Sequence, residues 1–491
     1  MDSILSKYKK RAGSKFRRWA KAVFCGCLCT GAFLHAPGVE AAPSTDTRPN
    51  IIFLLSDDQR PDTIAALGNP VIETPNLDAL VAEGVRFSRA VCATPLCVPS
   101  RAEILTGVGG FRNGFRAGRR AIDPALATWA GTLRGAGYHT WYVGKWHNDG
   151  MPTTRGYEES LGLFHSGGAK WWKPQVDGNG QPVTGYKGWI FQSDDGEKYP
   201  ELGVGLTPNI SAKFADAAIT FIERDHDKPY FLHVNFTAPH DPLLVPPGYE
   251  DKYDPDAIPL PKNFAPVHPF DHGNLDGRDE QVLPAPRTEA MVRKDIALYY
   301  AVVSHLDAQV GRILEALERS GEKDNTILIY TSDHGLAMGS HGLRGKQNMY
   351  EHTVNVPLII RGPGIPQGRQ SDAQCYLRDL FPTTCDLVGM DIPPTVEGKS
   401  LQPLWTGESE SIYDAVFCHY GDVQRMIRTD RWKLIYYPHL DRTQLFDLKN
   451  DPEERNDLSK FAAHEATVAE LRGRLAAWQK AVGAPVRDSI P

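Results

Sequence analysis

Five short apolar segments of the chain each end in polar residues. Each segment is rich in Val, Ile, Leu and aromatic residues, which is typical of strands that a sheet buries on both faces. The segments are residues 50–58, 138–147, 229–240, 325–335 and 356–364. We expect them to form the strands of a parallel sheet.

Helical patterns lie between these segments. One places Thr74 as an N-cap, Pro75 in the first turn and Gly84 as the stop, which predicts an amphipathic helix. From about Thr288 to Arg319, apolar side chains recur at helical spacing, which predicts a long helix that covers the core. Strands that alternate with helices predict an α/β fold in which helices sandwich a large mixed, mostly parallel sheet.

Charged and histidine side chains follow four of the predicted strands. In open α/β sheets, ligands bind beyond the carboxyl ends of the strands. The side chains at these ends are Asp57 and Asp58, Lys145 and His147, His240, and Asp333 and His334. We expect them to meet at one edge of the sheet and to form a functional site there.

The pattern changes after about residue 405. Two short β-like segments, residues 415–420 and 426–438, precede a terminal amphipathic helix. This predicts a small antiparallel sheet plus a helix, packed on the main body. The expected organisation is a leader (1–41), a large α/β domain (42–405) and a C-terminal α+β subdomain (406–491).

The first 41 residues have the layout of a secretory signal peptide. A basic head precedes an apolar run of about 13 residues and the small-residue site Val39-Glu40-Ala41. An uncleaved membrane anchor is the alternative, but a spanning helix needs roughly 20 apolar residues. Arg17-Arg18 suits a twin-arginine signal, although the residues after it fit poorly. We expect export to the periplasm or the extracellular space, without stable membrane insertion.

Loss of the leader leaves a strongly acidic chain. The leader carries 8 of the 54 basic and 2 of the 60 acidic residues, so 46 basic and 58 acidic residues remain, a net charge of −12. General nucleic-acid binding depends on neutralisation of phosphates by Lys and Arg. The composition therefore argues against a nucleic-acid partner, and a polyanionic substrate would need a local basic pocket.

Five of the eight cysteines remain once the leader is removed: Cys92, Cys97, Cys375, Cys385 and Cys418. An odd number leaves at least one thiol unpaired, and no Cys-x-x-Cys pair suggests zinc or a redox site. If the compartment is oxidising, a disulfide between Cys375 and Cys385, ten residues apart, is one alternative. One thiol is therefore expected to have a separate role.

Cys97 lies in the segment TPLCVPSRAEILTG, residues 94–107. Its motif, Cys-x-Pro-Ser-Arg followed by three residues and Leu-Thr-Gly, resembles the sulfatase signature at every defined position. The segment GYHTWYVGKWH, residues 137–147, resembles the second signature of the same family. From about residue 48 to 460, the order of the remaining segments is similar to type I sulfatases of the alkaline phosphatase superfamily.

The resemblance implies an alkaline-phosphatase-like fold and a sulfuric ester hydrolase. In this family a separate maturation enzyme oxidises the cysteine of the motif to formylglycine before folding. For Cys97, the hydrated aldehyde would supply two hydroxyl groups on one carbon. One hydroxyl can attack sulfur, and the other can later expel sulfate.

The chemistry also calls for a divalent cation, because a negative nucleophile must be shielded from a negative sulfate ester. Carboxylates are hard oxygen ligands that suit Ca²⁺. His334 stands where many sulfatases have asparagine, as in the iduronate-sulfatase branch, and an imidazole is a softer ligand than an amide oxygen. The expected ligands are Asp57, Asp58, Asp333, His334 and the modified Cys97.

Further roles follow from the resemblance residue by residue. A helix that starts at Ser100 would place Arg101 beside the nucleophile, where it can hold the alkoxide. Lys145 would bridge the hydrated aldehyde and sulfate, and His147 would take the proton whose loss releases sulfate. The pair that holds the sulfate oxygens and protonates the departing alcohol would be His240 and Lys346, which lie in TAPHDP and HGLRGKQNMYE.

Other features have weaker interpretations. Residues 271–280 look acidic but lack the spacing of a calcium loop, so we expect an exposed loop that could line the substrate entrance. Residues 111–120 are basic and could steer an anionic polymer or form a solvated loop. Trp171, Trp172 and Trp189 could stack on sugar rings or pack in the core.

These observations predict an exported sulfatase that hydrolyses the sulfate esters of sulfated carbohydrates. A phosphonate or phosphodiester hydrolase of the same superfamily is an alternative, because it shares the nucleophile and the metal site. A sulfated-glycan binder with an unconverted thiol is another alternative, although it would not need acid, base and metal residues.

Overall fold

The computed structural model describes residues 46–116 and 119–484. The predicted signal peptide, residues 1–41, lies outside the described residues and stays a prediction. Among the described residues, no helix has both the length and the apolar composition needed to cross a membrane.

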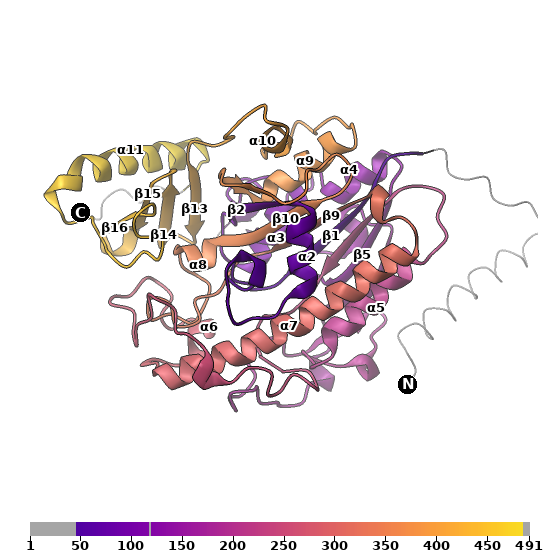
Figure 1. Ribbon diagram of the computed structural model, residues 1–491, viewed down its shortest axis with the longest axis horizontal. Helices are drawn as coiled ribbons and strands as arrows, with labels where there is room; N and C mark the ends of the chain where they lie inside the picture. Colours follow the sequence, from indigo (N-terminus) through magenta and orange to yellow (C-terminus); the bar gives the residue numbers. More distant parts are fainter. Residues whose placement is uncertain (1–45, 117–118, 485–491) are drawn as a thin grey trace, which may run out of the picture.

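A ten-stranded mixed sheet forms the centre of the molecule (Figure 1). Neighbouring strands follow the order β11-β2-β10-β9-β1-β8-β5-β6-β7, and β12 pairs with β2. The strands are β1 (Asn50–Ser56), β2 (Val85–Val91), β5 (His139–Lys145), β6 (Glu159–Ser166), β7 (Trp189–Gln192), β8 (Tyr230–Asn235), β9 (Thr326–Ser332), β10 (Asn355–Arg361), β11 (Arg369–Ser371) and β12 (Cys375–Tyr376). Strands β9, β1, β8, β5 and β6 are parallel, which confirms the predicted mostly parallel sheet.

The fifth predicted strand runs in the opposite direction. Strand β10 is antiparallel to both β9 and β2. The expectation that residues 356–364 add a parallel strand was wrong, because a buried apolar run has the same pattern in either direction. Helix α8 (Glu351–Val354) leads directly into β10, which therefore begins at the edge of the sheet where β9 ends.

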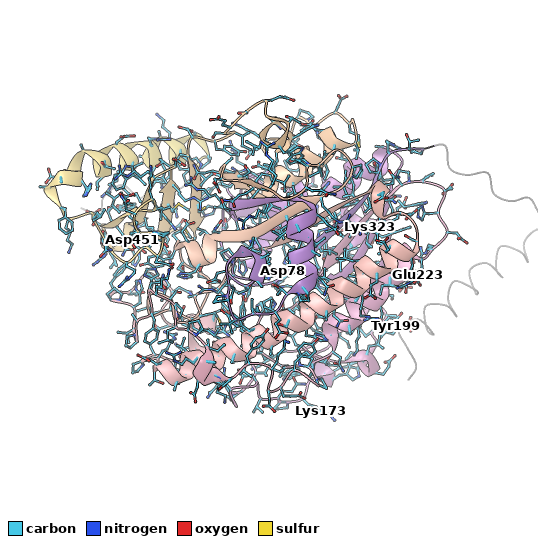
Figure 2. All side chains as sticks on the ribbon, in the orientation of Figure 1. Asp78, Lys173, Tyr199, Glu223, Lys323 and Asp451 are labelled. Carbon is cyan, nitrogen blue, oxygen red and sulfur yellow. The ribbon has the colours of Figure 1, made fainter. Side chains whose placement is uncertain are left out.

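Helices cover both faces of the sheet, as predicted. Successive residues of a strand face opposite sides. Ile52 and Leu54 pack with α2 (Pro75–Glu83), α5 (Ile210–Ile222) and α7 (Glu289–Arg319). Ile51, Phe53 and Leu55 pack on the other side with α3 (Cys97–Thr106), α4 (Trp129–Gly135), α9 (Leu380–Leu387) and α10 (Gln402–Thr406). Figure 2 shows side chains filling the space between these helices and the sheet.

The two helices expected from the sequence form with the predicted ends. Helix α2 follows Thr74 and stops before Gly84. Thr74 does not cap the helix backbone with its side chain; its hydroxyl accepts the Ala65 N–H and donates to Asp78. At α7, the Thr288 hydroxyl accepts the Met291 N–H and caps the helix.

A small antiparallel sheet and a helix form the C-terminal part, as predicted. The strands are β13 (Val416–Tyr420), β14 (Gln424–Arg428), β15 (Trp432–Tyr437) and β16 (Arg442–Asp447). One face packs on Leu471 and Leu475 of α11 (Glu465–Ala481). The other face packs on Leu343, Tyr350 and Val354 of the large domain, so an apolar core joins the two parts. Shorter elements are β3 (Phe115–Arg116), β4 (Arg119–Arg120) and α6 (Arg278–Gln281).

The five described cysteines are free thiols, and all are buried. Cys375 lies in β12 and Cys385 in α9, and no disulfide joins them. The alternative of a disulfide between these two residues is not found in this structure.

Candidate active site

The residues expected at the edge of the sheet come together in one buried site. Asp57, Asp333 and the turn carrying His240 follow the carboxyl ends of β1, β9 and β8, while Lys145 is the last residue of β5. Helix α3 brings Cys97, and the loop after β9 brings Lys346. The side chains linked there by hydrogen bonds and ion pairs are Asp57, Asp58, Cys97, Arg101, Lys145, His240, Asp333, His334 and Lys346.

The Cys97 thiol is surrounded by nitrogen atoms. Its Sγ lies 3.4 Å from His334 Nε2 and 3.4 Å from Lys346 Nζ. Burial alone would raise the pKa of the thiol, but the positive charges of Lys145, Lys346 and His334 lower it well below its usual value. A hydrogen bond with His147 lowers it further. The environment therefore favours an anionic group at this position.

Arg101 binds carboxylates instead of pointing only at the nucleophile. Helix α3 begins at Cys97, three residues before the predicted start at Ser100. Arg101 Nε donates to Asp333 at 2.9 Å and its Nη2 donates to Asp57 at 3.2 Å. Its Nη1 is buried without a hydrogen-bond partner, so one N–H group remains for a further acceptor in the site.

A lysine, a tyrosine and a carboxylate meet at the end of β1. Lys145 Nζ donates to Asp57 Oδ2 at 2.6 Å, and the Tyr186 hydroxyl donates to the same oxygen. Burial raises the pKa of Asp57, but the positive charges of Lys145 and Arg101 outweigh burial and lower it. Nothing in the sequence identified Tyr186, which lies in a glycine-rich insertion far from both signatures.

Asp58 faces the opposite side of the site. Its two carboxylate oxygens accept hydrogen bonds from Lys346 Nζ at 2.8 and 2.9 Å. His240 Nε2 lies 3.7 Å from Asp58 Oδ2, so His240 and Lys346 converge on one carboxylate. Asp58 has a φ of 68°, a left-handed conformation that aspartate tolerates better than most residues.

The donor set fits a divalent cation. Ligand atoms of Asp57, Cys97, Asp333 and His334 all lie within 4.8 Å of one another. Burial first, and then the charges of Asp57 and Cys97, raise the pKa of Asp333 to about 6. A cation between these groups would offset that repulsion. His334 Nδ1 donates to Gly335 O at 3.1 Å. Burial lowers the pKa of His334, but the charges of Asp333 and Asp58 outweigh burial and raise it to about 9, so a bound cation would replace the proton on Nε2, the nitrogen that faces Cys97.

His147 and Trp189 extend the site toward the insertion. His147 is half-buried, and burial together with the charge of Lys145 lowers its pKa to about 4. The Trp189 ring on β7 lies edge-on to His147 with ring centroids 4.9 Å apart. Of the three tryptophans singled out in the sequence, Trp189 is the one that contacts a predicted catalytic residue, whereas Trp172 packs over Gly205.

The prediction of an exposed loop at residues 271–280 was wrong in part. His272, Asp279 and Glu280 are buried, while Asp271 and Asp276 are exposed. The polar sequence favoured an exposed loop, but these three polar side chains can be buried because each has a hydrogen-bond partner that is distant along the chain. In the basic segment, Arg112 pairs with Glu397.

Comparisons with known proteins identify the family. The sulfatase family model matches residues 49–390, and the model of the C-terminal region of N-sulphoglucosamine sulphohydrolase matches residues 339–481. The chain belongs to the sulfatase family. It is therefore a sulfuric ester hydrolase, as the resemblance of the two signatures predicted.

Several proteins are similar to this sulfatase over most of their length. An arylsulfatase of Clostridium perfringens is 31% identical over 87% of this chain and 93% of its own. An N-acetylglucosamine-6-O-sulfatase of Bacteroides thetaiotaomicron is 30% identical over 88% of this chain and 86% of its own. The solved structure of a protein in complex with its substrate D-glucosamine-2-N,6-O-disulfate is similar to this chain with a TM-score of 0.70 and 27% identity. The match covers 89% of this chain and 98% of the other.

Proposed function

We propose that this sulfatase is an exported enzyme that hydrolyses sulfate esters of carbohydrates, with formylglycine at position 97 and one calcium ion. The observation that carries the proposal is the buried Cys97, which contacts both His334 and Lys346 at 3.4 Å within a ring of catalytic-type side chains. The sugar sulfatases among its relatives support the carbohydrate substrate.

The positive groups of the site suit an anionic substrate. Arg101, Lys145 and Lys346 are at least 98% buried, so their charges act in a medium that screens them weakly. The hydrated aldehyde would supply the attacking hydroxyl, and the calcium ion would draw charge from the sulfate oxygens. The proposed ligands are Asp57, Asp333, His334 and the neighbouring Asp58. Lys145 and Lys346 would hold sulfate oxygens.

Two histidines suit the two proton transfers. His240 lies with Lys346 on the Asp58 side, where its Nε2 would protonate the oxygen of the departing alcohol. His147 is hydrogen-bonded to Cys97, and its low pKa keeps the imidazole neutral and able to accept a proton near pH 7. It would take the proton from the second hydroxyl of the aldehyde hydrate when sulfate leaves.

The proposal is tested with protein that is coexpressed with a formylglycine-generating enzyme. Mass spectrometry of the Cys97 peptide should show the loss that accompanies replacement of CH₂SH by CHO. The converted protein should release inorganic sulfate from 4-nitrophenyl sulfate and from defined sulfated saccharides, beginning with N-acetylglucosamine 6-sulfate. Cys97→Ala should fold normally and release none.

Two results would contradict the proposal. A Cys97 peptide that keeps its thiol mass in protein that releases sulfate would exclude the formylglycine. The same thiol mass in protein that releases no sulfate would favour the glycan-binder alternative. Turnover of a phenyl phosphonate monoester without turnover of any sulfate ester would favour the phosphonate hydrolase alternative.

A further inference from the structure

Three consecutive residues of helix α6 lie behind the two side chains assigned to the departing alcohol. Arg278, Asp279 and Glu280 form part of the acidic segment 271–280, which the proposed chemistry does not use. Asp279 and Glu280 are 2% and 3% exposed, although surface residues of this type are normally solvated. The three side chains bind the two loops that carry His240 and Lys346, and Glu280 also binds Arg287.

Arg278 holds the turn that carries His240. Its guanidinium binds Asp241 through two nitrogens, Nη1 at 2.5 Å and Nη2 at 3.0 Å. Asp241 in turn receives the His240 Nδ1–H on its backbone oxygen at 2.6 Å, with its carboxylate Oδ1 3.2 Å away. Because Nδ1 donates its proton to Asp241, Nε2 is the ring nitrogen that faces Asp58 and the site.

Asp279 and Glu280 hold the loop that carries Lys346. Glu280 Oε2 accepts the Arg344 N–H at 2.9 Å, and its Oε1 accepts the Gly345 N–H at 2.8 Å. Asp279 Oδ2 accepts the Gln347 side-chain N–H at 2.7 Å. The two backbone amides that precede Lys346 and the side chain that follows it are thus tied to α6.

Arg278 joins the two sets of contacts, because its guanidinium also binds Asp279. Charge-assisted and bidentate bonds of this kind fix geometry as well as contribute energy. We propose that residues 278–280 position His240 and Lys346 relative to each other, so that the proton donor and the sulfate-binding lysine meet the leaving-group side of the ester together. This inference rests on the proposed function. It makes Arg278 a positioning residue for His240 and Lys346, the two side chains on the leaving-group side of the site.

The test uses a readout that a general loss of structure does not change selectively. Proton donation matters most when the leaving oxygen is basic, as in phenyl sulfate, whose phenol resembles a tyrosine side chain with a pKa of about 10. It matters little for 4-nitrophenyl sulfate, whose leaving group is a weak base. Displacement of His240 should therefore affect the first substrate far more than the second.

We expect Arg278→Met to lower kcat/KM for phenyl sulfate by about 10-fold to 100-fold, with a fall of less than about threefold for 4-nitrophenyl sulfate. Arg278→Lys, which keeps the charge but loses the bidentate geometry, should lie between the wild type and Arg278→Met. Arg312→Met is the matched control, since Arg312 pairs with Asp216 at 2.6 Å and is similarly exposed. It should leave both rates unchanged.

Equal losses with both substrates, or no loss with phenyl sulfate, would overturn the inference. Thermal unfolding of each variant identifies a folding defect, and the ratio of the two rates remains informative for any variant that is folded at the assay temperature. Failure of the wild type to hydrolyse either sulfate would instead contradict the proposed function. The two failures are therefore distinguishable.

Discussion

Lys145 Nζ lies 2.6 Å from Asp57 Oδ2, and neither side chain is exposed to solvent. Removal of one partner from a buried ion pair destabilises a protein by about 3–5 kcal/mol, and we expect the lower end of this range here because Arg101 still contacts Asp57 at 3.2 Å. Asp57 is also a proposed calcium ligand, so a bound cation would compensate the same charge. The lysine and the metal are therefore expected to have overlapping effects on stability.

We predict that Lys145→Met lowers the free energy of unfolding by about 3 kcal/mol in EDTA, and by clearly less in excess calcium. Urea denaturation under both conditions measures the difference. Lys252→Met is the control, because Lys252 pairs with the exposed Glu73 and solvent screens that pair. Its small effect should not depend on calcium, and equal losses for Lys145→Met in both buffers would contradict the prediction.

Calcium should stabilise the folded protein through the proposed ligands. Saturation at about 100 times the dissociation constant contributes about 2.7 kcal/mol to the free energy of unfolding. Asp333→Asn should remove most of this gain, since Asp333 belongs to the group of four converging ligands. Thermal unfolding with and without calcium tests it, and a calcium effect of unchanged size in Asp333→Asn would exclude Asp333 as a ligand.

Three buried histidines should make the protein sensitive to mild acid. Burial, the largest cause, lowers the pKa of His268 to about 4 and those of His272 and His341 to about 3. The unfolded chain takes up these protons near pH 6.5, whereas the folded protein does not. Stability is therefore lost as the pH falls from about 6.5 toward 4, by at most about 1.4 kcal/mol per pH unit for each histidine.

The double variant with His268→Gln and His272→Gln should show a shallower fall in the free energy of unfolding between pH 6.5 and 5. Urea denaturation at several pH values gives the slope for both proteins. His464→Gln serves as the control, because His464 is partly exposed at the start of α11. A slope that is the same in the double variant and the wild type would show that other groups cause the acid sensitivity.

A buried ion cluster joins the C-terminal sheet to the large domain. Lys433 Nζ on β15 lies 2.9 Å from Glu351 and 2.7 Å from Glu454, and Lys433 itself is fully buried. Lys433→Met should lower the free energy of unfolding by about 3 kcal/mol, because two carboxylates lose their shared cation. The variant Arg474→Met, which breaks an exposed pair with Asp414 in the same part of the chain, should have little effect. Urea denaturation compares them, and similar losses would contradict this account.

The sequence was sufficient for the elements that depend on local pattern. The strand positions and the extent of α7 follow from apolar periodicity, and the limits of α2 follow from Pro75 in its first turn and Gly84 after its end. The gathering of strand-end residues follows from the general geometry of parallel sheets. These rules use short-range information, which a single sequence contains.

The remaining features depend on tertiary contacts. Nothing in the local sequence gives the direction of β10 or brings the Tyr186 hydroxyl to Asp57. Arg278 and Glu280 look like solvated residues, because their partners Asp241 and Gly345 are distant along the chain. Asp241 is an exception, since its place next to His240 was a signal that sequence reasoning overlooked.

The glycine before Lys145 is required by the approach of two strands. Gly144 has a φ of 93°, and a Cβ added there would lie 1.9 Å from the Asn235 carbonyl oxygen on β8. Gly144→Ala should therefore force β5 away from β8, lower the free energy of unfolding by about 2 kcal/mol or more and displace Lys145. Urea denaturation measures the stability, and 4-nitrophenyl sulfate hydrolysis reports the displacement. Gly135→Ala is the control, because a Cβ there meets nothing within 4 Å and alanine favours the helix. Wild-type stability in Gly144→Ala would mean that the two strands can separate without cost.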